Sequence, residues 1–300
     1  MNTAAARRET RQGLFYALAA YVLWGLFPLY WYPLDGAPID AAQILAQRIA
    51  WSAVAALIFL FAGRRGGELL AVCRQPKLAA ALSVSAVCIS INWLVYLWAV
   101  TNRHVLEAGL GYFISPLFNV LLGRVVLKES LNAWQKAALG LAFTGILWLA
   151  LPAGQIPWVA LLLAVSFGFY GLIRKTAPVG ALVGLVWETL VVLPFALAYL
   201  LYVYADGRWA MGALNGVQTA VLIGSGAATV VPLLCFAAGA RRIPLSVLGM
   251  IQYGSPTIQI LTGLWLFGET FDTHRFIGYL WVWSGVVMYL TAAWRARSDK

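Results

Sequence analysis

Long apolar runs recur along almost the whole chain, each of about 20 residues, the length that a helix needs to cross a bilayer core of roughly 30 Å. The composition agrees with such spans, because 62% of the 300 residues are hydrophobic and only 11% are charged. A soluble domain carries about a quarter charged residues. Transmembrane strands would alternate apolar and polar residues. The sequence therefore predicts an all-α integral membrane protein.

The apolar runs predict ten transmembrane helices. They lie at residues 13–33, 42–62, 77–99, 106–127, 132–151, 157–175, 180–204, 214–239, 246–267 and 275–294. The basic tail at residues 1–12 resembles the start of a signal peptide, but no small-residue cleavage site follows it. We therefore expect the first run to remain as an uncleaved span. The short loops leave no room for a soluble catalytic domain.

Lysine and arginine are unevenly divided between alternate ends of the predicted helices. Seventeen of the 21 fall on the side that carries both termini, and only Arg48, Arg103, Arg208 and Arg275 fall on the other. The positive-inside rule places the richer side, with both termini, in the cytoplasm. Topology thus accounts for the net charge of +10, and nucleic acid is not an expected partner.

Two segments of the chain resemble each other at an offset of 140 residues. Residues 109–130 read GLGYFISPLFNVLLGRVVLKES, and residues 249–270 read GMIQYGSPTIQILTGLWLFGET. Six of the 22 aligned positions are identical, where composition alone predicts about one or two. The identical pairs are Gly109/Gly249, Ser115/Ser255, Pro116/Pro256, Leu121/Leu261, Gly123/Gly263 and Glu129/Glu269.

This similarity predicts a duplicated architecture. The first five-helix repeat covers residues 13–151, the second covers residues 157–294, and a tail follows at 295–300. An odd number of helices inverts the second copy, so Glu129 and Glu269 lie at opposite faces and are expected to have structural roles at helix ends. Secondary transporters use inverted repeats of this kind, with the substrate held near the middle of the membrane.

Several stretches also resemble a known family. LEAGLGYFISPLFNVLLG, AYVLWGLFPLYW, INWLVYLWAV, VPLLCFAAGARRIPLSVLG and QYGSPT are similar to the RarD branch (chloramphenicol-sensitive protein, EamA-type) of the drug/metabolite transporter superfamily. The resemblance runs from about residue 11 to residue 294 and implies a ten-helix permease of the bacterial inner membrane. The chain departs from the branch at Gln47, where a histidine is often found.

Three ionisable residues within or at the edge of predicted spans are candidates for substrate binding, because charges in a membrane are costly and usually functional. Arg48 and Glu107 share the outer leaflet, so either a structural ion pair or direct ligand contact accounts for them. Glu188 lies in the inner half, where we expect no basic neighbour. An unpaired carboxylate there would suit a protonatable or amine-binding site.

Polar and aromatic residues near the middle of the spans complete the candidate substrate site. An apolar cavity with a few oriented donors suits a small amphipathic ligand, whereas helix packing and interhelical hydrogen bonds are the alternative explanation. The set comprises Trp24, Asn92, Trp93, Tyr96, Tyr112, Asn119, Tyr170, Gln252, Tyr253 and Gln259.

Five prolines fall within predicted helices and mark possible hinges or static kinks, since each removes a backbone hydrogen bond. They are Pro28, Pro116, Pro194, Pro232 and Pro256.

The sequence as a whole favours a secondary-active exporter of a small amphipathic metabolite or drug, working by alternating access with H⁺ or a counter-substrate. An intramembrane enzyme is the alternative, because Gly224-Ser225-Gly226 resembles the serine motif of rhomboid-type proteases. However, a serine nucleophile needs a nearby base, and His104 and His274 lie near outer helix ends. A sensor or scaffold is a further alternative, but the short loops and the lack of a predicted cytoplasmic domain argue against it. The three cysteines form no metal-ligand set, and no cofactor is expected.

Overall fold

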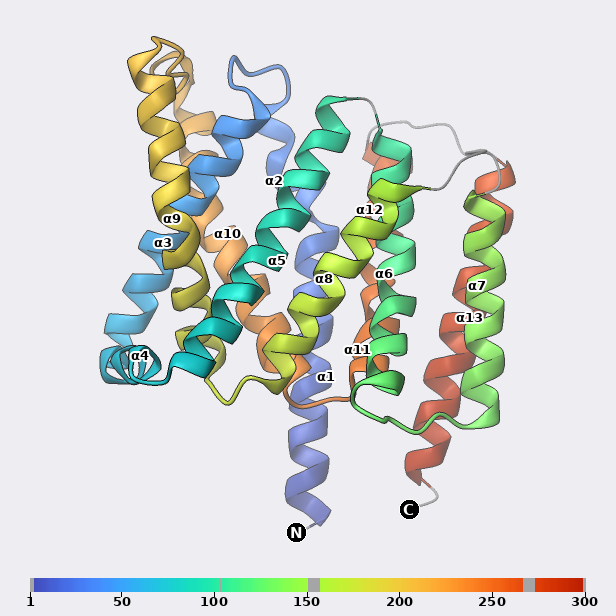
Figure 1. The fold of residues 1–300 in the computed structure, drawn as a ribbon. Helices are drawn as coiled ribbons and strands as arrows, with labels where there is room; N and C mark the ends of the chain where they lie inside the picture. The colour runs from blue at the N-terminus through green and yellow to red at the C-terminus, as the bar shows by residue number, and fades with distance from the viewer. Residues whose placement is uncertain (1–2, 103, 151–156, 267–272, 299–300) are drawn as a thin grey trace.

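The computed structural model describes residues 3–102, 104–150, 157–266 and 273–298, and the regular elements within these ranges are helices (Figure 1). The α-helices and two short 3₁₀ helices are α1 (Thr3–Gly25), α2 (Phe27–Trp31), η1 (Tyr32–Leu34), α3 (Ala41–Ala62), α4 (Gly66–Cys73), α5 (Pro76–Thr101), α6 (Val105–Val125), α7 (Ala133–Ala150), α8 (Trp158–Thr176), α9 (Ala181–Ala205), η3 (Met211–Ala213), α10 (Gly216–Ala240), α11 (Leu245–Gln252), α12 (Gly254–Leu266) and α13 (Thr273–Ser298).

Eight of the ten predicted runs each coincide with one helix, with ends that differ by at most four residues. The other two runs, 13–33 and 246–267, are broken into shorter helices. Helix α4 was not predicted, because its eight residues are too few for a span and it lies between two predicted helices.

A proline follows each of the two breaks. The axis bends by 43° between Arg7–Gly25 and Phe27–Leu34, where Pro28 occupies the first turn of α2. The second break lies at Tyr253, just before Pro256 in the first turn of α12. A proline in a first turn lacks only an N–H that has no helical partner there. The other three of the five prolines predicted as hinges or kinks lie inside continuous helices. These are Pro116 in α6, Pro194 in α9 and Pro232 in α10.

Seven helices of the described chain are long and apolar enough to cross a membrane, or up to eight if the bent pair at the N-terminus forms one span. Helices α11 and α12 have only 8 and 13 residues. Helix α7 begins with Gln135 and Lys136 in its first turn, which lowers its hydropathy.

The helices run up and down between two ends of a bundle. Helix α1 begins and α13 finishes at the lower end in Figure 1, which we call the termini end; the other end is the opposite end. Helix α8, which starts the second half of the chain, begins at the opposite end. The basic residues that follow α3 and close α8 lie at the termini end, and these include Arg64, Arg65, Arg174 and Lys175.

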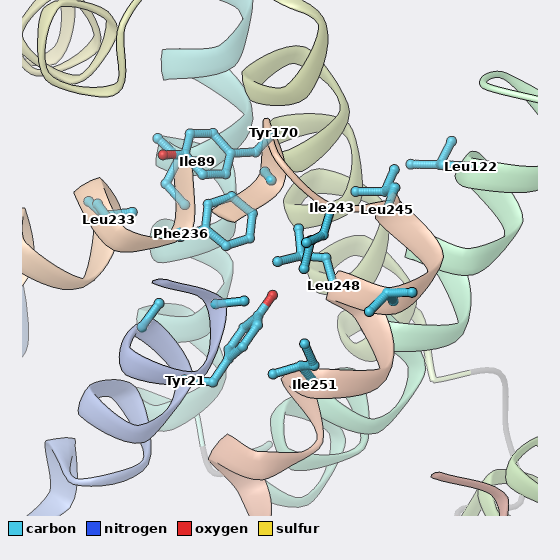
Figure 2. Close-up of a cluster of buried hydrophobic side chains, with 14 of the residues drawn as sticks. Tyr21, Ile89, Leu122, Tyr170, Leu233, Phe236, Ile243, Leu245, Leu248 and Ile251 are labelled. Atoms are coloured by element: carbon cyan, nitrogen blue, oxygen red, sulfur yellow. The ribbon is translucent and has the colours of Figure 1, made fainter. Parts of the chain in front are cut away.

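The two halves of the chain share one hydrophobic core. Helix α1 packs against α10, α8 against α5, α3 against α9, α6 against α11, and α7 against α13. Figure 2 shows the centre of this core, where Tyr21 from α1, Tyr170 from α8 and Phe236 from α10 lie close to Leu248 from α11. Because each of these five helix pairs joins the first half to the second, neither half buries its apolar surface alone.

Small residues allow α7 and α13 to pack closely. A Cβ atom built on Gly145 would lie 2.7 Å from the carbonyl oxygen of Gly278, and one built on Gly285 would lie 2.6 Å from that of Ala138. Both distances are too short for real Cβ contacts with backbone. Close backbone approach through small residues is a general way to hold helices together in membranes.

This packing predicts the effect of a larger side chain on α7. We expect Gly145→Leu to lower the free energy of unfolding by about 1–3 kcal/mol through overpacking. Gly140→Leu is the matched control on the same helix, because nothing lies within 4 Å of a Cβ at Gly140. Thermal unfolding in detergent, followed by tryptophan fluorescence, measures both. Equal loss of stability in the two variants would contradict the close α7–α13 contact.

Candidate functional site

A cavity of about 640 Å³ lies at the opposite end of the bundle. Its walls come from α2, η1, the first half of α3 and the second half of α5. Apolar and aromatic side chains dominate the lining, and Arg48 and Asp35 are its charged residues. The volume is within the range of about 300–1,000 Å³ that small-molecule sites usually have.

Capping interactions at the start of α3 hold Arg48 at this cavity. The carboxylate of Asp40 accepts a hydrogen bond from the backbone N–H of Gln43 at 2.7 Å and a second from Gln43 Nε2 at 2.8 Å. Gln43 Nε2 also donates to the carbonyl oxygen of Arg208 at 3.0 Å, which ties α3 to the loop after α9. The N-terminus of α3 is therefore fixed, and Arg48 follows about two turns later.

The guanidinium group of Arg48 lies over the ring of Trp93, with Cζ 4.4 Å from the ring centroid. The rings of Tyr96 and Tyr112 are next to it, 6.0 Å apart, and both hydroxyl groups are close enough to interact with its charge. Arg48 Nε is buried and has no hydrogen-bond partner. Four predicted site residues, Arg48, Trp93, Tyr96 and Tyr112, are thus brought together.

The acidic groups near this end are mostly engaged elsewhere. Asp40 caps α3, and Asp206 binds Arg208 at 2.5 Å. Within the described side chains, no carboxylate forms an ion pair with Arg48. Glu107 belongs to α6, but its side chain is outside the described set, so its pairing with Arg48 stays a prediction.

The expectation that Glu188 has no basic neighbour was wrong. Its Oε1 atom lies 3.6 Å from Arg174 Nη1 and accepts a hydrogen bond from Ser85 Oγ at 2.6 Å. Arg174 and Glu188 are only 1% and 3% exposed, so the pair is shielded from water. Arg174 lies in the last turn of α8 and was counted among the basic residues on the cytoplasmic side, yet its long side chain is buried against Glu188 of α9.

A glycine makes room for this side chain. A Cβ atom at Gly184 would lie only 1.8 Å from Arg174 Nη1, and Arg174 Nη2 donates to the carbonyl oxygen of Ala181 at 2.8 Å. Gly184 lies one turn before Glu188 on α9. A glycine at this spacing was the one feature of the sequence that could have indicated space for a partner of the carboxylate. Three polar atoms of the pair, Arg174 Nε, Arg174 Nη1 and Glu188 Oε2, have no hydrogen-bond partner.

The predicted amide residues tie helices together. Asn119 Nδ2 donates to Gln252 Oε1 at 2.8 Å, which joins α6 to α11. Asn92 Nδ2 donates to the carbonyl oxygen of Leu163 at 2.9 Å, which joins α5 to α8. Gln259 Nε2 donates to the carbonyl oxygen of Trp24 at 3.2 Å, next to the break after α1. Interhelical hydrogen bonding accounts for these three contacts.

Trp24, Tyr170 and Tyr253 lie apart from the cavity lining. The rings of Trp24 and Tyr170 both pack on Phe236, with centroid distances of 5.7 Å and 5.6 Å. Tyr253 donates its hydroxyl hydrogen to the carbonyl oxygen of Phe113 at 3.0 Å. All three belong to the shared hydrophobic core or pack against it, and Figure 2 shows Tyr170 there beside Phe236.

Glu129 caps a helix from the other half of the chain. Its carboxylate accepts hydrogen bonds from the backbone N–H groups of Leu245 and Ser246, at 2.7 and 3.0 Å, and from Ser246 Oγ at 2.5 Å. Nearby, Lys175 Nζ donates to the carbonyl oxygens of Ala240 and Ile243. We call these contacts the termini-end latch, because they fasten the loop after α6, and α8, to the α10–α11 connection. Glu269, which is equivalent to Glu129 in the second half, is outside the described residues.

The serine motif takes part in helix packing. Ser225 Oγ donates to the carbonyl oxygen of Leu222 at 2.6 Å within α10. A Cβ atom at Gly226 would lie 2.2 Å from the carbonyl oxygen of Trp51, so this glycine permits the close contact of α10 with α3. His104 and His274 stack on Trp98 and Trp148.

Comparisons with known proteins relate the chain to transporters. The model of the EamA-like transporter family matches residues 11–151. An uncharacterized transporter of Pseudomonas aeruginosa is 43% identical, with 97% of each chain covered. Protein RarD of Escherichia coli is 38% identical, with 95% of this chain and 96% of that protein covered. Chloramphenicol-sensitive protein RarD of Pseudomonas aeruginosa is 30% identical, with 94% of each covered.

The fold is also similar to that of a protein of known crystal structure. The TM-score is 0.72, and the match covers 94% of this chain and 98% of the other. The two sequences are 18% identical, so this similarity concerns the fold alone.

The buried ion pair predicts non-additive mutational effects. We expect Arg174→Gln or Glu188→Gln alone to cost about 3–5 kcal/mol of stability, because each leaves an uncompensated buried charge. The double variant removes both charges and should recover at least half of that loss. Arg65→Gln and Glu68→Gln are the matched controls, because that ion pair is 39% and 50% exposed. Thermal unfolding in detergent measures the set; a double variant no more stable than the singles would contradict the pairing.

Proposed function

Since this chain belongs to the EamA-like transporter family, we propose that it is a secondary transporter that moves a small amphipathic metabolite or drug by alternating access. The observation that carries this proposal is the cavity at the opposite end of the bundle, which combines an apolar, aromatic lining with the guanidinium group of Arg48. We place the protein in a bacterial inner membrane with the termini end in the cytoplasm, following the positive-inside rule.

The packing of the helices supports two inverted repeats. The offset of 140 residues relates α1 to α8 and α5 to α10, with a few residues of slippage in the first pair. The contact of α1 with α10 then has its counterpart in the contact of α8 with α5. Phe113 and Tyr253 are exactly one offset apart, and they touch through the Tyr253 hydroxyl. Equivalent residues meet only near the axis that relates two copies.

Equivalent positions in the two halves border an open cavity in the first half and are covered by side chains in the second. This difference supports alternating access. The offset relates Arg48 to Glu188 and Tyr96 to Phe236. The first position of each pair lines an open cavity. At the second, Glu188 is covered by the Arg174 side chain, and Phe236 is covered by the stacked ring of Tyr170. A transporter with inverted repeats exchanges these two arrangements during its cycle.

In this proposal the termini-end latch keeps the cytoplasmic end of the bundle closed. Glu129 fastens the two halves to each other on the side that we place in the cytoplasm, and Lys175 holds α8 to the α10–α11 connection within the second half. Opening toward the cytoplasm requires this side to separate, so the latch stabilises the state described here. The proposed direction is outward, and a relative named for chloramphenicol sensitivity motivates the inclusion of drugs among the solutes. Energy would come from H⁺ or a counter-substrate.

Transport in proteoliposomes tests the function. We expect flux for one or more members of a broad panel of labelled amphipathic solutes, and collapse of an imposed proton gradient should identify coupling to H⁺. Arg48→Gln should lower the flux by about tenfold or more, as expected for losing a charge-assisted contact.

Arg208→Gln is the matched control for this measurement. Its guanidinium group also lies over an aromatic ring, 5.4 Å from that of Tyr202, but outside the cavity. Flux should stay close to that of the unmodified protein. An absence of flux across the whole panel, with folded protein confirmed by a cooperative melt, would overturn the transport proposal.

The latch predicts a local change in hydrogen exchange. Glu129→Gln keeps the size of the side chain but loses one acceptor oxygen and the negative charge at the N-terminus of α11. We expect the amides of the first turn of α11 to exchange faster by on the order of tenfold. Glu68→Gln, at the same end but half exposed, should leave these amides unchanged. Unaltered exchange in Glu129→Gln would show that the latch does not hold this end closed.

A further inference from the structure

The cavity is lined by a half-buried cation that the described part of the chain leaves incompletely paired. Arg48 offers five N–H donors, yet its Nε has no hydrogen-bond partner and no described carboxylate forms an ion pair with it. A charge taken out of water is costly unless it is paired. Asp35, the acidic residue of the lining, belongs to the loop before α3 and is not among the described ion pairs.

Trp93 restricts how a ligand reaches this cation. The indole ring lies against the face of the guanidinium group, with Cζ 4.4 Å from the ring centroid. Trp93 therefore covers one face of the guanidinium group. The N–H groups lie in the plane of the guanidinium, so a ligand would bind them at its edge. A planar guanidinium edge matches the two oxygens of a carboxylate, which accept two parallel hydrogen bonds.

The rest of the lining suits a flat apolar body. Trp31, Leu45, Trp93, Tyr96 and Leu97 surround the space next to Arg48. Aromatic rings prefer to stack or meet edge to face, so a ring of the ligand gains contact area on several sides. The volume of about 640 Å³ accommodates a ligand of a few rings.

We propose that the cavity binds an organic anion: a carboxylate attached to an aromatic or other flat apolar body, with the carboxylate on the edge of Arg48 and the body among the aromatic residues. This assignment rests on the proposed transport function and specifies its substrate class. A carboxylate on the guanidinium edge would also supply Arg48 with a counter-charge that no described carboxylate supplies.

Three ligands that share one ring system test the assignment by isothermal titration calorimetry on purified protein in detergent. Indole-3-acetate carries a carboxylate, indole-3-acetamide is its neutral counterpart, and tryptamine carries an ammonium group. We expect the acid to bind at least about tenfold more tightly than the amide, because it alone forms a charge-assisted bidentate contact, and tryptamine to bind most weakly.

Variants assign the preference to Arg48. Arg48→Gln should remove the preference for the acid and keep binding of the amide, and Arg48→Lys should keep part of it, because lysine retains the charge but not the planar fork. Arg208→Gln is again the control, because its guanidinium group lies outside the cavity. Equal binding of acid and amide, a preference for tryptamine, or no binding of any of the three overturns the proposal.

The same experiment separates this inference from the transport function. Binding that favours the acid, without flux in proteoliposomes, supports the anion site and counts against transport. Flux of neutral or cationic solutes, with no preference for the acid, supports transport and counts against the anion site.

Discussion

The cost of removing charge from water governs the arrangement of this bundle. Inside a membrane a charged side chain must be paired or must face a cavity, and the two halves of the protein meet this requirement in different ways. Glu188 is paired with Arg174 and bound by Ser85, with Gly184 leaving space for the guanidinium group. Arg48 faces a cavity and rests on Trp93. One charge is paired inside the bundle, and the other borders a cavity.

Close packing between the two halves holds the helices that carry these charged residues in place. Helices of the first half contact helices of the second throughout the described chain, and their rings and aliphatic side chains form a single core (Figure 2). Glycines such as Gly145 and Gly226 bring backbones together. The termini-end latch adds hydrogen bonds from Glu129 across the same boundary. The movement of the halves that we propose for transport would have to break these polar contacts at the termini end.

Much of the fold could be predicted because hydrophobicity and helix length are local properties. Eight runs became single helices with nearly the expected ends, and Pro28 and Pro256 accompany the two breaks. Part of the site was also predictable, since Arg48, Trp93, Tyr96 and Tyr112 were selected as polar or aromatic residues in spans. Arg174 was missed because positive charge near a helix end is the usual signal of a loop, and nothing local shows which way a long side chain points.

The sequence by itself determined that this chain is helical and embedded in a membrane, that its basic residues gather on one side, and that its halves resemble each other. These properties depend on composition and on spacing along the chain. Only the tertiary structure decided that Glu188 is paired, that Asn119 and Gln252 bind each other, and that Arg48 meets Trp93 at an open cavity. Those contacts join residues up to 133 positions apart, and the packing of helices alone determines which distant side chains meet.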